Sequence, residues 1–216
     1  MPHDEERELR EAIVAHARRM NAAGINQGKS GNVSARAADG FLVTPSALPY
    51  DAMQPEDVVF VGWDGAARGA RAPSSEWRLH RDIYLARPDA GGVVHAHAMF
   101  ATTLACLDRS IPPFHYMVAV AGGLDIRCAA YATFGTQELS DHVLAALEGR
   151  KACLMSHHGM IAFSDSLAAA FALAVEVETL AAMYFRALQI GEPALLPESE
   201  MRGVLARFER YRAGRG

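Results

Sequence analysis

Several features that would identify other classes of protein are scarce in this sequence of 216 residues. Its three cysteines, Cys106, Cys128 and Cys153, lie far apart with no CxxC pair, so neither a disulfide framework nor a thiolate metal site is indicated. Neither sign of charge dominates, since 21 basic and 25 acidic residues are spread along the chain and give a net charge of −4. Without a basic stripe, nucleic acid is not an expected partner.

Long apolar runs and export signals are also missing. The most apolar run covers residues 167–175, well short of the roughly 20 residues that span a bilayer, so it predicts a buried helix and no membrane association. Residues 3–6 read His-Asp-Glu-Glu, which is neither the basic start nor the apolar stretch of a signal peptide. Together with the few cysteines, this predicts a cytoplasmic protein.

The remaining composition is that of a globular protein, with half of the residues hydrophobic and 21% charged. The length favours one domain over residues 1–216. Helical spacing of apolar residues predicts helices at 4–23, 75–87, 100–107, 137–147, 167–188 and after Pro197. Short apolar runs between turn signals predict strands at 33–36, 41–44, 58–61, 93–97, 115–120 and 153–163. This interleaving favours an α/β fold in which helices cover both faces of a sheet.

A histidine pair ends the valine-rich strand expected at 93–97. His95 and His97 flank Ala96, and alternate residues of a strand point to the same face. Two neutral imidazoles suit zinc, which then needs one or two further nitrogen or oxygen ligands. The alternative is a surface pair without a function, but a polar pair at the end of a buried strand is costly, which favours the metal.

A third imidazole is expected from the segment Ser156-His157-His158-Gly159-Met160, the other histidine-rich strand segment. Neighbouring residues of a strand point to opposite faces, so only one of His157 and His158 can join the first pair. The pattern alone leaves both open. The other histidine is expected to fill the core and bond a backbone carbonyl.

Two segments could seat a phosphate. Ser74, Ser75 and Glu76 begin the helix expected at 75–87, where serine caps and an acidic residue stabilise a helix start. The same N–H groups and hydroxyls could also bind a phosphate, with Glu76 beside it. The segment Gly28-Lys-Ser-Gly-Asn32 lacks the spacing of a nucleotide P-loop and follows a helix, so it predicts an ordinary turn or a cradle for a smaller phosphate.

An ordered set of motifs runs through nearly the whole chain. Its members are residues 24–28 (GINQG), 31–34 (GNVS), 43–50 (VTPSALPY), 73–77 (PSSEW), 94–97 (VHAH), 111–123, 131–136 (YATFGT) and 157–159 (HHG). Together they resemble the class II aldolase/adducin family. The resemblance implies an α/β/α sandwich with a largely antiparallel central sheet, and a homotetramer with sites between subunits.

The resemblance also implies a zinc ion in each subunit. His95, His97 and His158 correspond to its ligands, which selects His158 over His157. Glu76 corresponds to a residue that is both a labile metal ligand and the catalytic base. Zinc is therefore the expected cofactor.

Substrate contacts are implied in the same way. The family's phosphate-binding positions correspond to Asn32, Ser46, Ala47, Ser74 and Ser75. Ser46-Ala47 stands where the family typically has Thr-Gly, but a hydroxyl and a backbone amide remain. Tyr116 resembles the proton donor that reaches the site from a neighbouring subunit. Tyr211 matches a C-terminal tyrosine that closes over the substrate, although the tail beyond it diverges.

The reaction implied is retro-aldol cleavage of a ketose 1-phosphate, L-fuculose 1-phosphate or similar, to dihydroxyacetone phosphate and an aldehyde. The chain has only two lysines, Lys29 and Lys151, against nineteen arginines. A Schiff-base route requires an amine nucleophile, whereas a metal-dependent route does not. Glu76 would take the C4 hydroxyl proton, or a proton of dihydroxyacetone phosphate in synthesis, and Tyr116 would handle the proton on the aldehyde oxygen.

Three alternatives remain on this fold. A pentulose-phosphate 4-epimerase shares the retro-aldol step, but its relatives have aspartate where this chain has Glu76. A methylthioribulose-phosphate dehydratase uses a similar zinc site and differs in its product. An adducin-like assembly module is not an enzyme and has lost the metal ligands, whereas the three histidines and Glu76 are present here.

Overall fold

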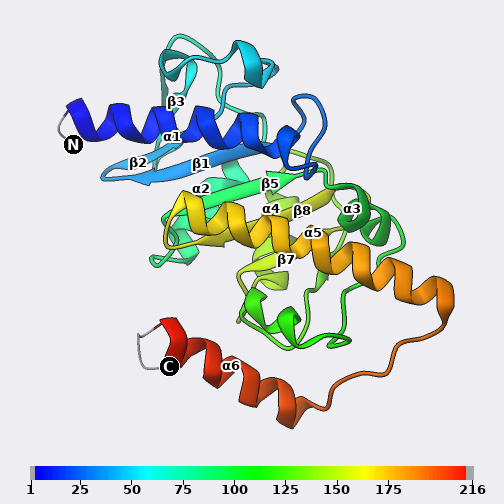
Figure 1. Ribbon diagram of the computed structural model, residues 1–216. Helices are drawn as coiled ribbons and strands as arrows, with labels where there is room; N and C mark the ends of the chain where they lie inside the picture. Colours follow the sequence, from blue (N-terminus) through cyan, green and yellow to red (C-terminus); the bar gives the residue numbers. More distant parts are fainter. Residues whose placement is uncertain (1–2, 213–216) are drawn as a thin grey trace.

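The computed structural model describes residues 3–212 and has one eight-stranded sheet in the order β4-β3-β2-β1-β5-β8-β7-β6 (Figure 1). All neighbouring strands are antiparallel except β6 and β7, which are parallel. The strands are β1 (Asn32–Ala37), β2 (Gly40–Val43), β3 (Val59–Gly62), β4 (Ala67–Arg68), β5 (Gly92–Ala96), β6 (Cys128–Ala129), β7 (Ala152–Met155) and β8 (Gly159–Ser164). The predicted largely antiparallel sheet is confirmed.

Helices cover both faces of this sheet, as predicted. Successive residues of β5 alternate between two cores, since Val93 packs in the core of α2 and α4, and Val94 in the core of α1, α3 and α5. The structure has α1 (His3–Ala22), α2 (Trp77–Ala86), α3 (Met99–Ala105), α4 (Gln137–Ala146), α5 (Leu167–Ile190), α6 (Glu198–Arg212) and the 3-10 helices η1 (Tyr50–Ala52), η2 (Pro55–Asp57) and η3 (Tyr116–Ala121). The result is an α/β/α sandwich whose two cores meet at the sheet.

The apolar helix α5 is part of the larger core. By length and composition it could cross a membrane, and it is the one helix among the described residues that passes this test. In the fold it runs along the sheet (Figure 1), and Leu173, Val177 and Leu180 are buried there. This agrees with the buried helix predicted from the sequence.

Two predicted strands are wrong. The run at 115–120 forms η3, because the side chain of His115 accepts from the Met117 N–H at 3.3 Å and Gly122 ends the turn in the left-handed region at φ 89°. The periodicity of a short apolar run does not show whether the run forms a strand or a short helix. The run at 153–163 is two strands, β7 and β8, because the chain turns between Met155 and Gly159.

The C-terminal helix α6 is separated from α5 by an extended segment, residues 191–197 (Figure 1). It packs beside η3, where the Leu196 N–H donates to the Pro113 carbonyl at 2.9 Å and Met201 is fully buried. The 3-10 helix η3, which carries Tyr116, and helix α6, which carries Tyr211, therefore lie side by side.

Candidate metal centre

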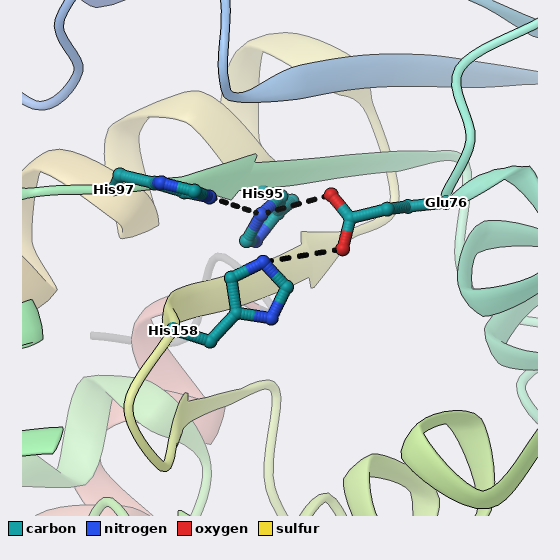
Figure 2. A group of neighbouring side chains, drawn as sticks. All are labelled: Glu76, His95, His97 and His158. Carbon is teal, nitrogen blue, oxygen red and sulfur yellow. Dashed lines mark hydrogen bonds and ion pairs between the residues drawn. The ribbon is translucent and has the colours of Figure 1, made fainter. Parts of the chain in front are cut away.

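Strand β5 carries His95, and His97 follows the last residue of the strand, Ala96. His95 lies opposite Asn32 of β1 and Ile161 of β8, and its Nε2 is 3.1 Å from the Nε2 of His97 (Figure 2). The Nδ1 of His95 lies 2.8 Å from the Met160 carbonyl. A carbonyl only accepts, so Nδ1 carries a proton, and in the neutral ring the Nε2 lone pair faces the cluster.

The turn between β7 and β8 adds a third imidazole. His158 turns inward, whereas His157 has a left-handed φ of 52° and is exposed, so the core position expected for the other histidine is wrong. The ring centroid of His158 is 4.8 Å from that of His95 and 5.0 Å from that of His97. At Gly159 a Cβ atom would lie 2.5 Å from the Ala96 carbonyl oxygen, so only glycine lets β8 approach β5 this closely. The structure thus brings His158, and not His157, to the pair.

Glu76 completes the group from the N-cap position, directly before α2. Its Oε2 is 3.2 Å from the Nε2 of His95, and its Oε1 is 3.2 Å from the Nε2 of His158 (Figure 2). The Nδ2 of Asn32 donates to Oε2 at 3.0 Å. The residue that caps α2 is Glu76 rather than a serine, and the Ser74 hydroxyl accepts from the Glu76 N–H at 3.3 Å.

These four side chains fit a divalent metal ion. One donor atom from each of Glu76, His95, His97 and His158 lies within 4.8 Å of the others. Glu76 Oε1 is buried and makes no hydrogen bond among the described residues, since its 3.2 Å approach to His158 Nε2 lacks hydrogen-bond geometry. A bound ligand would compensate its burial. Three imidazoles with one carboxylate are a donor set that zinc and similar ions accept.

The protonation of the group also suits a metal. Burial and the neighbouring His95 lower the pKa of His97 and of His158 to about 4, so both are neutral near pH 7. Burial alone would raise the pKa of Glu76, but the charge and hydrogen bond of His95 hold it below its usual value. In return, the Glu76 carboxylate raises the pKa of His95 despite its burial. Without a metal, a protonated His95 therefore supplies the positive charge beside the Glu76 carboxylate.

The cluster opens into a cavity of about 260 Å³. Beside three of the four clustered residues, Glu76, His97 and His158, the cavity is lined by Ser30, Ser75, Tyr131, Ala132, Phe134 and His157. The sequence interpretation gave no role to Tyr131 or Phe134, although both lie in the motif 131–136. Both rings are more than half exposed and border the same cavity, so a bound molecule could contact them.

The proposed phosphate positions come from two segments that lie side by side. The Ser46 N–H donates to the Ala72 carbonyl and the Ser74 N–H to the Thr44 carbonyl, both at 3.0 Å. Ala47 has a left-handed φ of 60°, a conformation in which glycine is unstrained, so its replacement of the family's glycine has a conformational cost. The amide of Asn32 instead contacts Glu76.

Lys29 lies beside the same seat. Its Nζ donates to the Ala47 carbonyl at 3.0 Å, which brings the turn at residues 28–32 next to the segment that contains Ser46. The cradle considered from the sequence and the phosphate seat implied by the resemblance are therefore neighbours.

Tyr116 and Tyr211 lie in a different cavity, of about 630 Å³, between η3 and α6. Tyr116 is 48% exposed and Tyr211 is 69% exposed, so both rings are open to another molecule. Neither lines the cavity of the histidine cluster. Within one chain the structure does not bring them to Glu76, and their contribution from a neighbouring subunit stays a prediction.

The segment after His97 is held by a half-buried carboxylate of α5, that of Glu178. Glu178 accepts from the Phe100 N–H at 2.9 Å and from the Ala101 N–H at 2.8 Å, at the start of α3. We expect Glu178→Gln to lower the free energy of unfolding by about 2 kcal/mol, because one charged acceptor is lost and an amide N–H faces a backbone N–H. Urea denaturation measures this free energy, with Glu176→Gln, two residues earlier, as the control. If Glu178→Gln were as stable as the parent protein, Glu178 would not stabilise the start of α3.

Comparisons with known proteins agree with this geometry. The sequence profile described as "Class II Aldolase and Adducin N-terminal domain" matches residues 11–185. A 5-methylthioribulose-1-phosphate/5-deoxyribulose-1-phosphate aldolase of Rhodospirillum rubrum is 59% identical, over 94% of this chain and 92% of that protein. An L-fuculose phosphate aldolase of Escherichia coli is 47% identical, over 96% of this chain and 97% of that protein.

A solved structure of an L-fuculose 1-phosphate aldolase superposes with a TM-score of 0.91 at 36% identity, over 94% of this chain and 96% of that chain. Fold, motifs and the His-Glu cluster therefore agree with the resemblance seen in the sequence. The chain belongs to the class II aldolase/adducin family.

Proposed function

We propose that this chain is a zinc-dependent aldolase that cleaves a ketose 1-phosphate to dihydroxyacetone phosphate and an aldehyde. The observation that carries the proposal is the convergence of three imidazoles and the Glu76 carboxylate at the mouth of a cavity. His95, His97 and His158 hold the metal, and Glu76 is both a labile ligand and the base. An adducin-like assembly module needs none of these donors, so their presence opposes that alternative.

The protein's own residues position the substrate and transfer its protons. When bound, the metal ion supplies a Lewis acid that polarises the substrate carbonyl and stabilises the negative charge left by bond cleavage. The C3–C4 bond breaks, the C4 hydroxyl loses its proton to become the aldehyde, and C3 takes up a proton. Glu76 is charged and faces the cavity, so it exchanges these protons. Tyr116 of a neighbouring subunit donates a hydrogen bond that stabilises the C4 oxygen while its proton passes to Glu76.

The phosphate binds where two segments meet. Ser46 and Ala47 lie beside Ser74 and Ser75 through backbone hydrogen bonds, and hydroxyl and N–H groups there suit a phosphate. Asn32 has a second amide hydrogen besides the one on Glu76, which is available to the same phosphate.

The substrate we favour has a short apolar end. Tyr131 and Phe134 form an aromatic wall of the cavity, which suits a methyl or methylthio group better than further hydroxyls. The relative named for 5-methylthioribulose and 5-deoxyribulose 1-phosphates is 59% identical, against 47% for the one named for L-fuculose phosphate. L-Fuculose 1-phosphate itself ends in a methyl group, so it stays in the panel of candidates.

The test is release of dihydroxyacetone phosphate from these three ketose 1-phosphates, with and without a chelator. We expect chelator-sensitive release, with the highest kcat/KM for the deoxy or methylthio pentulose, and loss of release in His95→Ala. Release that persists after metal removal would contradict metal dependence. A rearranged pentulose phosphate or a dehydrated product would instead indicate the epimerase or the dehydratase.

The cytoplasmic location, the single domain and the homotetramer follow from the family resemblance and the sequence, and they stay predictions. The tetramer matters for function, since Tyr116 and Tyr211 contribute to catalysis only if another subunit places them near Glu76.

A further inference from the structure

A continuous chain of buried hydrogen bonds runs from Glu76 into the core below it. Asn32 donates to Glu76 at 3.0 Å, His80 Nε2 lies 2.5 Å from Asn32 Oδ1, Ser34 Oγ lies 2.7 Å from His80 Nδ1, and Tyr84 completes the chain at 2.8 Å from Ser34. Ser34 and His80 have no exposed surface, and the other three are at most 4% exposed. Water therefore does not replace these contacts.

The hydrogen-bond chain arises because polar residues recur at every second position of β1 and at every fourth position from the start of α2. Asn32 and Ser34 are alternate residues of β1 and point to the face that α2 covers. Glu76, His80 and Tyr84 are spaced four residues apart from the start of α2, so they lie along one side of that helix. The two rows face each other, and each polar group of one row meets a polar group of the other.

The direction of every hydrogen bond follows from the charge at one end. The carboxylate of Glu76 only accepts, so Asn32 presents its Nδ2 to Glu76 and its Oδ1 to His80. His80 Nε2 must then carry a proton. Burial lowers the pKa of His80 to about 3, so the ring is neutral and its Nδ1 accepts from the Ser34 hydroxyl. Ser34 in turn accepts from the Tyr84 hydroxyl.

We propose that His80 is a positioning residue for Glu76, because its Nε2–H fixes the side-chain amide of Asn32 in the one orientation that donates to the catalytic carboxylate. This inference rests on the proposed role of Glu76. A flipped Asn32 would place its carbonyl oxygen against the carboxylate and would repel Glu76 from its place beside His95 and His158. Ser34 and Tyr84 fix the proton of His80 on Nε2.

Two amide variants separate this role from simple filling of the core. In His80→Gln the amide nitrogen takes the place of Nε2 and still donates to Asn32. In His80→Asn the shorter amide takes the place of Nδ1, so it still meets Ser34 but does not reach Asn32. Both put a neutral polar amide in the same site, and thermal unfolding shows whether their stabilities match.

In the zinc-loaded enzyme we expect His80→Asn to lower kcat for ketose 1-phosphate cleavage by roughly 10- to 100-fold, as for other partners that orient metal-site residues. His80→Gln is expected to keep most of the parent kcat. In an Asn32→Ala background, His80→Asn is expected to cause no further loss, because His80 acts through Asn32. Equal losses for Gln and Asn, or the same loss in both backgrounds, would overturn the proposal.

A second measurement does not depend on activity. Nitrogen-15 NMR of the zinc-loaded full chain, labelled at histidine, reports which ring nitrogen of His80 carries the proton, and His80→Gln identifies its signals. We expect a neutral ring protonated at Nε2; a proton on Nδ1 would overturn the proposal. If no ketose phosphate is cleaved while His80 has this tautomer, the proposed function fails and the hydrogen-bond chain stands.

Discussion

Glu76→Gln is expected to lower the rate of ketose 1-phosphate cleavage by roughly 10²- to 10⁴-fold, the usual contribution of a general base. Glutamine has the same shape and its carbonyl oxygen still accepts from Asn32, so the fold and the cluster remain. The amide cannot take up a proton, so the step that Glu76 performs is lost. The measurement is kcat for dihydroxyacetone phosphate release at saturating substrate.

The interpretation of this loss needs two further observations. The metal content of Glu76→Gln should equal that of the parent, since three imidazoles remain. Glu8→Gln on the exposed side of α1 removes the same charge far from the cluster and should keep the parent rate. A rate of Glu76→Gln within a few-fold of the parent would rule out the role as base.

His158→Ala is expected to abolish tight metal binding, whereas His157→Ala is expected to keep it. His158 Nε2 lies 3.2 Å from Glu76 and its ring faces His95 and His97, while His157 is exposed beside Tyr131. The affinity lost with a direct ligand should exceed the roughly 10- to 100-fold that follows loss of an outer partner. Zinc content after dialysis and competition with a chelator measure this affinity.

Thermal unfolding tests the His157→Ala and His158→Ala variants in an independent way. A ligand at a thousand times its Kd stabilises the folded state by about 4 kcal/mol, so excess zinc should raise the Tm of the parent and of His157→Ala. The Tm of His158→Ala should change little on zinc addition. The reverse order, with His157→Ala losing the response, would show that the other histidine of the pair holds the metal.

Several elements could be predicted from the sequence because their signals are local. The helices α1, α4 and α5 follow a repeat of apolar residues, and the shared face of His95 and His97 follows from strand geometry. The strand predicted at 115–120 was wrong because a strand and a short helix bury such an apolar run equally well. The caps at His115 and Gly122 favour the helix.

The choice between His157 and His158 shows where local rules end. Both were treated as strand residues, but they form a turn in which His157 adopts a left-handed φ of 52°. Strand alternation does not apply to such a turn. The inward direction of His158 depends on the close approach of Gly159 to Ala96, two residues more than sixty positions apart.

The fold class, the family and the candidate metal ligands could be predicted from the sequence, because they depend on residue types and on the order and spacing of motifs along the chain. The folded structure was needed to show which atoms of Glu76 approach the histidines, that Asn32 contacts Glu76 and that Tyr116 lies away from the cluster of its own chain. Such contacts join distant elements, and their geometry is set by how the helices pack on the sheet, which no single segment encodes.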